Sequence, residues 1–143
     1  MNNTLTFSAV NNQNDITMID EKLFTKALRK PLKRFILRIQ KTLDFNQKQV
    51  YTTAKMSSGS YKRFFDGEEL WRGRERIIIA CVFLLRDARE NKKIDEDGYQ
   101  ELNLELLHVC GDVAIVANDL SFAELKEYLN VASQSSRTHF NNH

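Results

Sequence analysis

The stretch RERIIIACVFLLRDARE, residues 74–90, carries charges at both ends and nine consecutive apolar residues, 77–85, in its centre. Its length predicts an α-helix, and a helix that is apolar on every side has to be buried on most sides. A membrane-spanning helix needs roughly twenty apolar residues, about twice this run. We therefore expect 74–90 to be the central helix of one folded domain.

The composition of the chain favours helices around this centre. The 143 residues are 42% hydrophobic, which is enough to build one core but not two full-sized domains. Five glycines and one proline are too few for an all-β sandwich, which needs a turn every ten residues or so. The expected fold class is all-α.

The segment before the centre predicts further helices. Apolar residues recur at spacings of three and four over 24–43, with basic residues between them. Pro31 interrupts this pattern, because proline lacks a backbone donor and clashes with the preceding turn. The expectation is a short helix that ends near Arg29 followed by a second over 31–42, or one kinked helix. Two more helices are expected, one from Asn46 and one from Ser57.

Capping residues mark the helices that follow the centre. Asp95 or Asp97 can cap a helix that runs to about Ala117. Ser121 and Glu124 form a capping-box pattern for a last helix that runs to about Ser133. The complete prediction is an all-α bundle of six or seven helices.

Domain boundaries follow from the polar ends of the chain. Residues 1–19 are rich in Asn and Gln and predict a disordered arm, in which 4–10 alternates weakly and could pair with a partner chain as a strand. Residues 20–134 are expected to form a single helical domain, and 135–143 a flexible tail. The start of the chain lacks a basic flank and an apolar signal core, so a cytoplasmic location is expected and no membrane contact.

Charge is distributed unevenly along the chain. Residues 22–76 contain fifteen Lys and Arg against five Asp and Glu, a balance of +10, whereas 77–143 carry a balance of −5. A basic segment followed by an acidic one suggests a polyanionic partner for one part of the chain only.

Patterns of enzyme or metal chemistry are not found in the sequence. The two cysteines lie in apolar stretches and are expected to be reduced core thiols. The acidic residues before Gly98 do not fit a calcium loop, because its first and twelfth positions would be Lys93 and Leu104. No glycine-rich phosphate loop and no zinc-ligand spacing occurs. We expect no catalytic residues, no metal and no cofactor.

The segment FNQKQVYTTAKMSSGSYKRFFDG, residues 45–67, predicts two short helices joined by a tight turn at 55–57. Ser57 is a favourable N-cap for the second helix. That helix turns Tyr61, Phe64 and Phe65 inward and leaves small and cationic residues outside. Such a surface suits the DNA major groove, because small residues permit close approach and Arg or Lys can donate to guanine edges or phosphates.

This segment resembles the helix-turn-helix of lambda-repressor/Cro-type (XRE-like) DNA-binding proteins, and the resemblance covers about residues 31–90. The matching residues are Gln47, Val50, Met56, Ser57, Tyr61, Phe64, Phe65 and Gly67. The following stretch, 67–88, also resembles the corresponding region of Xre-type antitoxins. Residues 91–143 lie outside the resemblance.

The resemblance and the outward face of the second helix together indicate a sequence-specific transcription regulator that binds double-stranded DNA. The expected DNA-contacting residues are Gln47, Lys48, Ser57, Ser58, Ser60, Lys62 and Arg63. Proteins of this class usually bind inverted repeats as twofold dimers. The C-terminal helices, 95–134, would pair two copies or bind a protein partner.

Three residues depart from the family pattern. Tyr51 stands where the family has a small residue, Lys55 where it has a left-handed glycine, and Asp66 is an acid near an expected phosphate contact. The departures at Tyr51 and Lys55 favour an alternative function, a protein–protein interaction module on a degenerate helix-turn-helix. Such a module could be an antitoxin or a mobile-element inhibitor of a host nucleic-acid machine.

Overall fold

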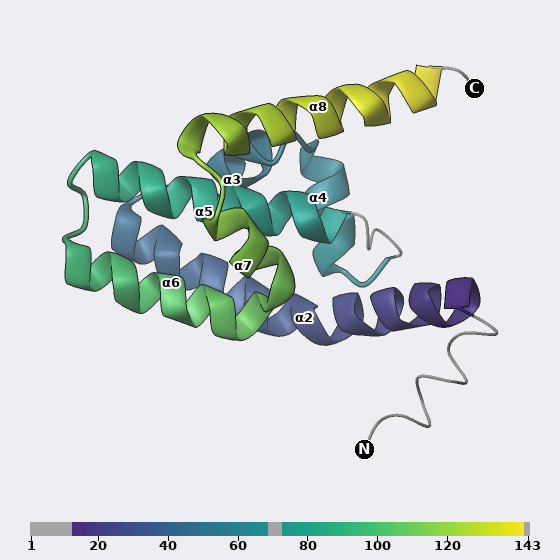
Figure 1. Cartoon of the computed structure of the whole chain (residues 1–143), viewed down its shortest axis with the longest axis horizontal. Helices are drawn as coiled ribbons and strands as arrows, with labels where there is room; N and C mark the ends of the chain where they lie inside the picture. Colours follow the sequence, from purple (N-terminus) through teal and green to yellow (C-terminus); the bar gives the residue numbers. More distant parts are fainter. Residues whose placement is uncertain (1–12, 69–72, 142–143) are drawn as a thin grey trace.

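The computed structural model describes the backbone of residues 13–68 and 73–141, and the side chains of these residues except 13–22, 24, 25 and 132–141. Seven α-helices and no strand occur in the part that is described (Figure 1). The expected all-α fold class is confirmed. The expected strand at 4–10 lies outside the described residues.

The helices follow one another with short connections. In chain order they are α2 (Gln13–Leu43), α3 (Gln47–Thr53), α4 (Ser58–Phe65), α5 (Gly73–Glu90), α6 (Glu96–Cys110), α7 (Asp112–Asn118) and α8 (Phe122–Asn141).

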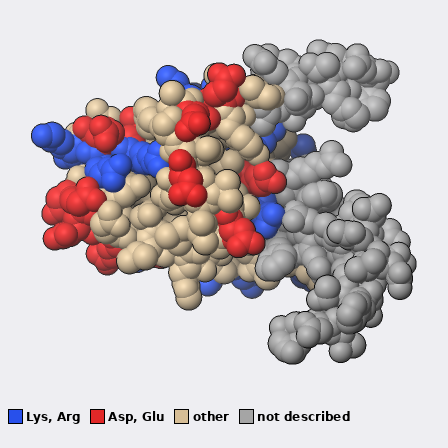
Figure 2. Space-filling view, in the orientation of Figure 1, with Lys and Arg blue, Asp and Glu red and all other residues tan. Residues whose placement is uncertain are grey.

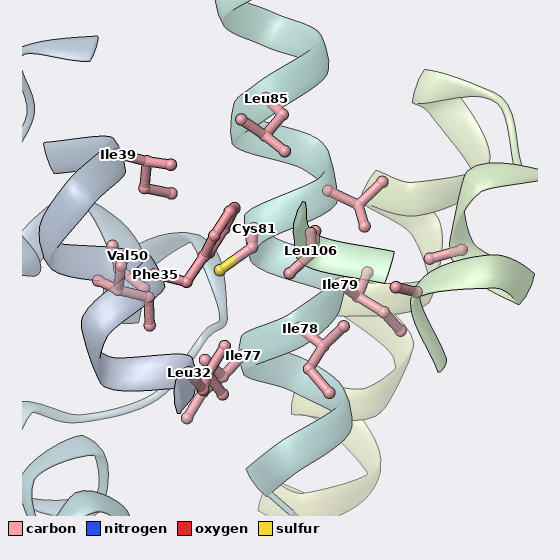
Figure 3. Packing of buried hydrophobic residues seen from close by; sticks show 14 of the residues in the cluster. Leu32, Phe35, Ile39, Val50, Ile77, Ile78, Ile79, Cys81, Leu85 and Leu106 are labelled. Atoms are coloured by element: carbon pink, nitrogen blue, oxygen red, sulfur yellow. The ribbon is translucent and has the colours of Figure 1, made fainter. Parts of the chain in front are cut away.

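Helix α5 is the centre of the molecule, as its apolar sequence predicted. Every other described helix packs against it (Figure 1). Eight of its side chains are buried: Ile77, Ile78, Ile79, Ala80, Cys81, Val82, Leu85 and Ala88. In the view of Figure 3, Phe35 of α2 lies beside Cys81, and Val50 of α3 lies beyond it. The core thus joins the basic N-terminal helices to the acidic C-terminal ones.

Of the two expected arrangements at Pro31, two separate helices do not occur, and α2 continues through the proline as one helix of 31 residues. Proline in a helix interior removes one hydrogen bond and costs about 3 kcal/mol. Leu28 and Leu32 on either side are 8% and 0% exposed, so their burial against the core offsets that cost. The helix begins at Gln13, seven residues before the expected domain boundary at residue 20.

The helix expected to run from Asp95 to about Ala117 is instead divided in two, and that prediction is wrong. Gly111 has φ 60° and ψ −125°, a conformation that favours glycine, and it separates α6 from α7. The expected cap is confirmed, since the Gly98 N–H donates to Asp95 Oδ1 at 2.7 Å.

The start of α8 was predicted well and its end was not. Ser121 and Glu124 form the expected capping box, with bonds of 3.1 Å from Glu124 N–H to Ser121 Oγ and 2.7 Å from Ser121 N–H to Glu124 Oε1. The helix runs to Asn141 rather than Ser133, and so extends into the expected tail. A helix already nucleated extends at little cost, because each added residue forms one further bond.

Polar and aromatic contacts fasten α7 and α8 to α5. The Arg86 guanidinium donates to the carbonyls of Leu120 and Asn118 at the end of α7. The rings of Phe83 and Phe122 stack with centroids 4.4 Å apart. These contacts fix the last two helices to the same core that carries α2–α4.

Replacing Phe35 with alanine should destabilise the fold by about 3–5 kcal/mol, because Phe35 is 1% exposed and its loss leaves a cavity beside α5. Leu37→Ala is the matched control, since Leu37 lies on the same helix but is 47% exposed. Urea unfolding of both variants measures the difference. Equal losses of stability would contradict the position of Phe35 in the core.

The contact between α8 and α5 predicts a dependence of stability on pH. Tyr128 Oη donates to Glu75 Oε1 at 2.7 Å, and burial together with this carboxylate raises the pKa of Tyr128 to about 12. An acid whose pKa is raised on folding stabilises the fold fully below its unfolded pKa of about 10, and this contribution is lost as the pH rises toward 12. Tyr128→Phe should therefore lose less stability than the wild type above about pH 10. Urea titrations from about pH 8 upward test this, and parallel curves would contradict it.

Candidate nucleic-acid interface

The connection between α3 and α4 is a tight turn of the kind that joins helix-turn-helix pairs. Helix α3 ends with two bonds, from Lys55 N–H to Thr52 O at 3.0 Å and from Met56 N–H to Tyr51 O at 2.9 Å. Lys55 has φ 59°, so the left-handed conformation expected at this position is confirmed. A non-glycine residue there costs about 1–2 kcal/mol, which the two turn bonds help to offset.

Helix α4 begins directly after this turn with the predicted cap. The Ser60 N–H donates to Ser57 Oγ at 3.0 Å. Tyr61 and Phe64 face inward and are 4% and 0% exposed. The inner face of α4 is therefore held by the core, and its opposite face is left to the surface.

Tyr51, which replaces a small residue in the family pattern, is accommodated by an aromatic cluster between α3 and α4. Its ring centroid lies 5.6 Å from that of Tyr61, and Tyr61 and Phe65 meet edge to face at 4.9 Å. Aromatic pairs at these distances attract one another beyond their burial. The large side chain thus fills the contact between the two helices instead of preventing it.

Lys33 of α2 fastens this cluster from the other side. Its ammonium lies 4.8 Å from the ring centroid of Phe65 and donates to Gln47 Oε1 at 3.1 Å. Partial burial lowers the pKa of Lys33, while the Asp66 carboxylate acts in the opposite direction. Lys33 therefore connects α2 to the start of α3 and to the end of α4.

Arg76 of α5 anchors the turn itself. Its Nε donates to Ala54 O at 3.2 Å and its Nη2 donates to Lys55 O. Partial burial lowers the pKa of Arg76. These carbonyls end α3 and have no partner within that helix, so the guanidinium satisfies them and complements the negative end of the helix dipole.

The seven expected DNA-contacting residues lie on α3, on α4 and on the cap between them. Lys48, Ser57, Ser58, Lys62 and Arg63 are exposed, and Gln47 and Ser60 are half-buried. The Lys62 and Arg63 side chains are 77% and 50% exposed. Gln47 differs from the expectation in that its Oε1 is engaged by Lys33, which leaves its amide N–H groups as donors.

Acidic side chains accompany both cations of α4. Lys62 Nζ lies 3.1 Å from Asp66 Oδ2, and Arg63 Nε lies 3.7 Å from Glu68 Oε2. The sequence singled out Asp66 but not Glu68. The pairing of Glu68 with Arg63 arises because the chain turns back at Gly67, which has φ 97°. Residues five apart do not share a face of a regular helix, so the sequence did not predict this pair.

Further basic residues are exposed on α2. Lys26, Lys30, Arg34 and Lys41 are exposed on that helix. Figure 2 shows the face that carries α5–α8, where red acidic side chains are spread over the surface and the Lys and Arg in view gather mainly at the left. The basic segment 22–76 and the acidic segment 77–143 therefore belong to one fold, in which the N-terminal helices are richer in Lys and Arg and the C-terminal helices richer in Asp and Glu.

Other chemistry is not indicated in the described residues. They contain no cluster of His, Cys, Asp and Glu suited to a metal ion. Burial raises the pKa of the Cys110 thiol to about 12, and Cys81 is fully buried with its pKa also raised, so neither is an activated nucleophile. None of the helices in the described part is both long enough and apolar enough to cross a bilayer.

Comparison with known proteins does not assign the chain to a family: no family model matches it, and neither a curated protein nor a solved structure is significantly similar.

Arg76→Ala should destabilise the fold by about 1–2 kcal/mol, because two turn carbonyls lose a charged donor that is partly exposed to solvent. Arg34→Ala is the control, since Arg34 is exposed and has no hydrogen-bond or ion-pair partner among the described residues. Its expected effect is within about 0.5 kcal/mol. Chemical denaturation compares the two, and equal stabilities would remove Arg76 as the anchor of the turn.

Proposed function

We propose that the chain is a sequence-specific DNA-binding regulator that reads duplex DNA with α4. The observation that carries this proposal is the division of α4 and its N-cap into a buried aromatic face and an exposed face of Ser57, Ser58, Lys62 and Arg63. Helix α4 follows the tight turn after α3 in the chain, as the second helix of a helix-turn-helix does. This exposed face lies within the segment of charge +10.

The chemistry of this face suits the major groove. Ser57 and Ser58 are small enough to let the start of α4 approach base edges, and Arg63 can donate two bonds to guanine O6 and N7. Lys48 and the free amide N–H groups of Gln47 suit phosphate oxygens, which fix the register of the protein on the duplex. Basic residues along α2 add attraction that does not depend on sequence.

A twofold dimer on an inverted repeat is part of the proposal. Half-sites one helical turn apart require two copies of α4 separated by about 34–36 Å. Leu104, Ile115 and Val116 of the C-terminal helices are 64%, 53% and 62% exposed, and these apolar side chains would be available for such pairing. Repression and activation are both compatible with such a dimer.

The alternative, a protein–protein interaction module, is favoured by one specific observation. Asp66 and Glu68 lie next to the two cations of α4 and reduce its net charge. A protein partner with an acidic surface would then be bound by the remaining basic residues. The two functions differ in sequence preference, because a base reader favours its own duplex by roughly 1000-fold or more.

Selection of bound duplexes from a random-sequence pool, at about physiological salt, tests the proposal. An inverted repeat is the expected result, and its spacing would give the distance between the two copies of α4. Recovery of random sequences, with weak binding to all of them, would favour the protein partner.

Arg63→Ala should weaken binding to the selected duplex by about 1–3 kcal/mol while changing affinity for random duplex much less. Lys126→Ala, which removes one exposed cation from α8, is the matched control and should leave both affinities nearly unchanged. Fluorescence anisotropy with the two labelled duplexes measures both. An unchanged affinity of the Arg63 variant for the selected duplex would exclude Arg63 as a base reader.

A further inference from the structure

The two cations of α4 are held next to carboxylates by backbone geometry and not by chance side-chain conformations. Lys62 and Asp66 are four residues apart, so they lie one above the other on the helix. Glu68 is brought back beside Arg63 by the turn that ends α4, in which the Glu68 N–H donates to Arg63 O at 3.1 Å.

Helix α2 fixes the position of Glu68 from the other side. Arg29 Nη2 donates to the Glu68 carbonyl at 2.6 Å. The Arg63 guanidinium also donates to Ser60 Oγ at 3.3 Å, which directs the side chain back along α4. The backbone of Glu68 is therefore held at both its N–H and its carbonyl, and this places the carboxylate beside Arg63, the cation that the proposed function uses for base reading.

These pairs are weak enough to be exchanged for a better partner. The four side chains are between 50% and 77% exposed, and exposed ion pairs add little to stability. A phosphate offers Arg63 and Lys62 much the same interaction that the carboxylates already provide. A guanine edge offers two directional bonds, and the base carries no net charge for the carboxylates to repel.

We infer that Asp66 and Glu68 are specificity-determining residues, which lower the affinity of α4 for DNA of any sequence more than its affinity for the correct site. In a non-specific complex the carboxylates compete with phosphates for the same donors. They also lie within about one Debye length, roughly 8 Å, of any phosphate that reaches those donors. The discrimination thus comes partly from repulsion of wrong sites and not only from attraction to the right one. This inference rests on the proposed DNA-binding function.

The test compares the full chain with its Asp66→Asn/Glu68→Gln variant on two probes, the duplex recovered by selection and a random-sequence duplex of equal length. The variant should bind the random duplex about threefold to tenfold tighter, and the ratio of the two affinities should fall by a similar factor. The salt dependence of random binding should steepen, by up to about two units of slope, because two cations become available to phosphates.

A matched control separates this effect from net charge. Asp97→Asn/Glu127→Gln removes the same two negative charges from exposed positions on α6 and α8. It should leave the affinity ratio unchanged. Circular dichroism checks the helix content of each variant, and Glu68→Gln alone, compared with Glu127→Gln, gives the same comparison for one charge if the double variant does not fold.

The outcomes distinguish the inference from the function on which it rests. Selective binding by the wild type and the variant with equal affinity ratios would overturn the role of the carboxylates and retain the DNA-binding function. A fall of the ratio in the control equal to that in the variant would also overturn it. Absence of duplex binding by both proteins would overturn the inference and the proposed function together.

Discussion

The burial of α5 on all sides is the constraint on which the rest of the structure depends. A helix with no polar face in its centre is stable only when other helices cover its whole circumference. Six described helices provide that cover, three from before α5 in the chain and three from after it. Neither group is complete without the other, because each supplies part of the same core around residues such as Cys81 and Val82.

Arginines near both ends of α5 fix the positions of the neighbouring helices relative to it. Arg76 satisfies the carbonyls that end α3, and Arg86 satisfies those that end α7. Apolar packing alone is tolerant of small rotations and slips, whereas a guanidinium that serves two carbonyls is not. The two arginines therefore set where the turn between α3 and α4 and the start of α8 lie relative to α5.

Local features of this fold could be predicted from the sequence, and features that depend on distant contacts could not. Ser57, Asp95 and Ser121 cap their helices as expected, because a cap involves a side chain and backbone only three residues apart. The left-handed conformation of Lys55 was expected only from the resemblance to the helix-turn-helix pattern. The sequence allowed either two helices or one helix at Pro31, and the choice between them could not be predicted because it depends on burial against the core.

The candidate site shows the same division. The seven residues expected to contact DNA all lie on or between α3 and α4, as the resemblance and the apolar spacing of the second helix together indicated. The engagement of Gln47 by Lys33, the anchoring of the turn by Arg76 and the position of Glu68 join residues five to 22 places apart. A single sequence does not show which distant residues come into contact, so these pairs could not be predicted. The break at Gly111 had a local signal, since glycine near a helix end commonly ends it, but the apolar pattern continued across it.

The shared core also has a mechanical consequence for any assembly that the chain forms. All the described helices share one core around α5, and Arg38 of α2 is also paired with Glu101 and Glu105 of α6, so the helices proposed to read DNA and those proposed to hold a second copy belong to one packed unit. Two copies joined through α6–α8 would therefore hold their two α4 helices at a fixed distance and angle. Inserting one base pair between half-sites moves them apart by about 3.4 Å and rotates one relative to the other. A dimer with a flexible linker can follow this change, whereas a rigid dimer cannot. The permitted spacing of binding sites would then be a property of side-chain packing around α5.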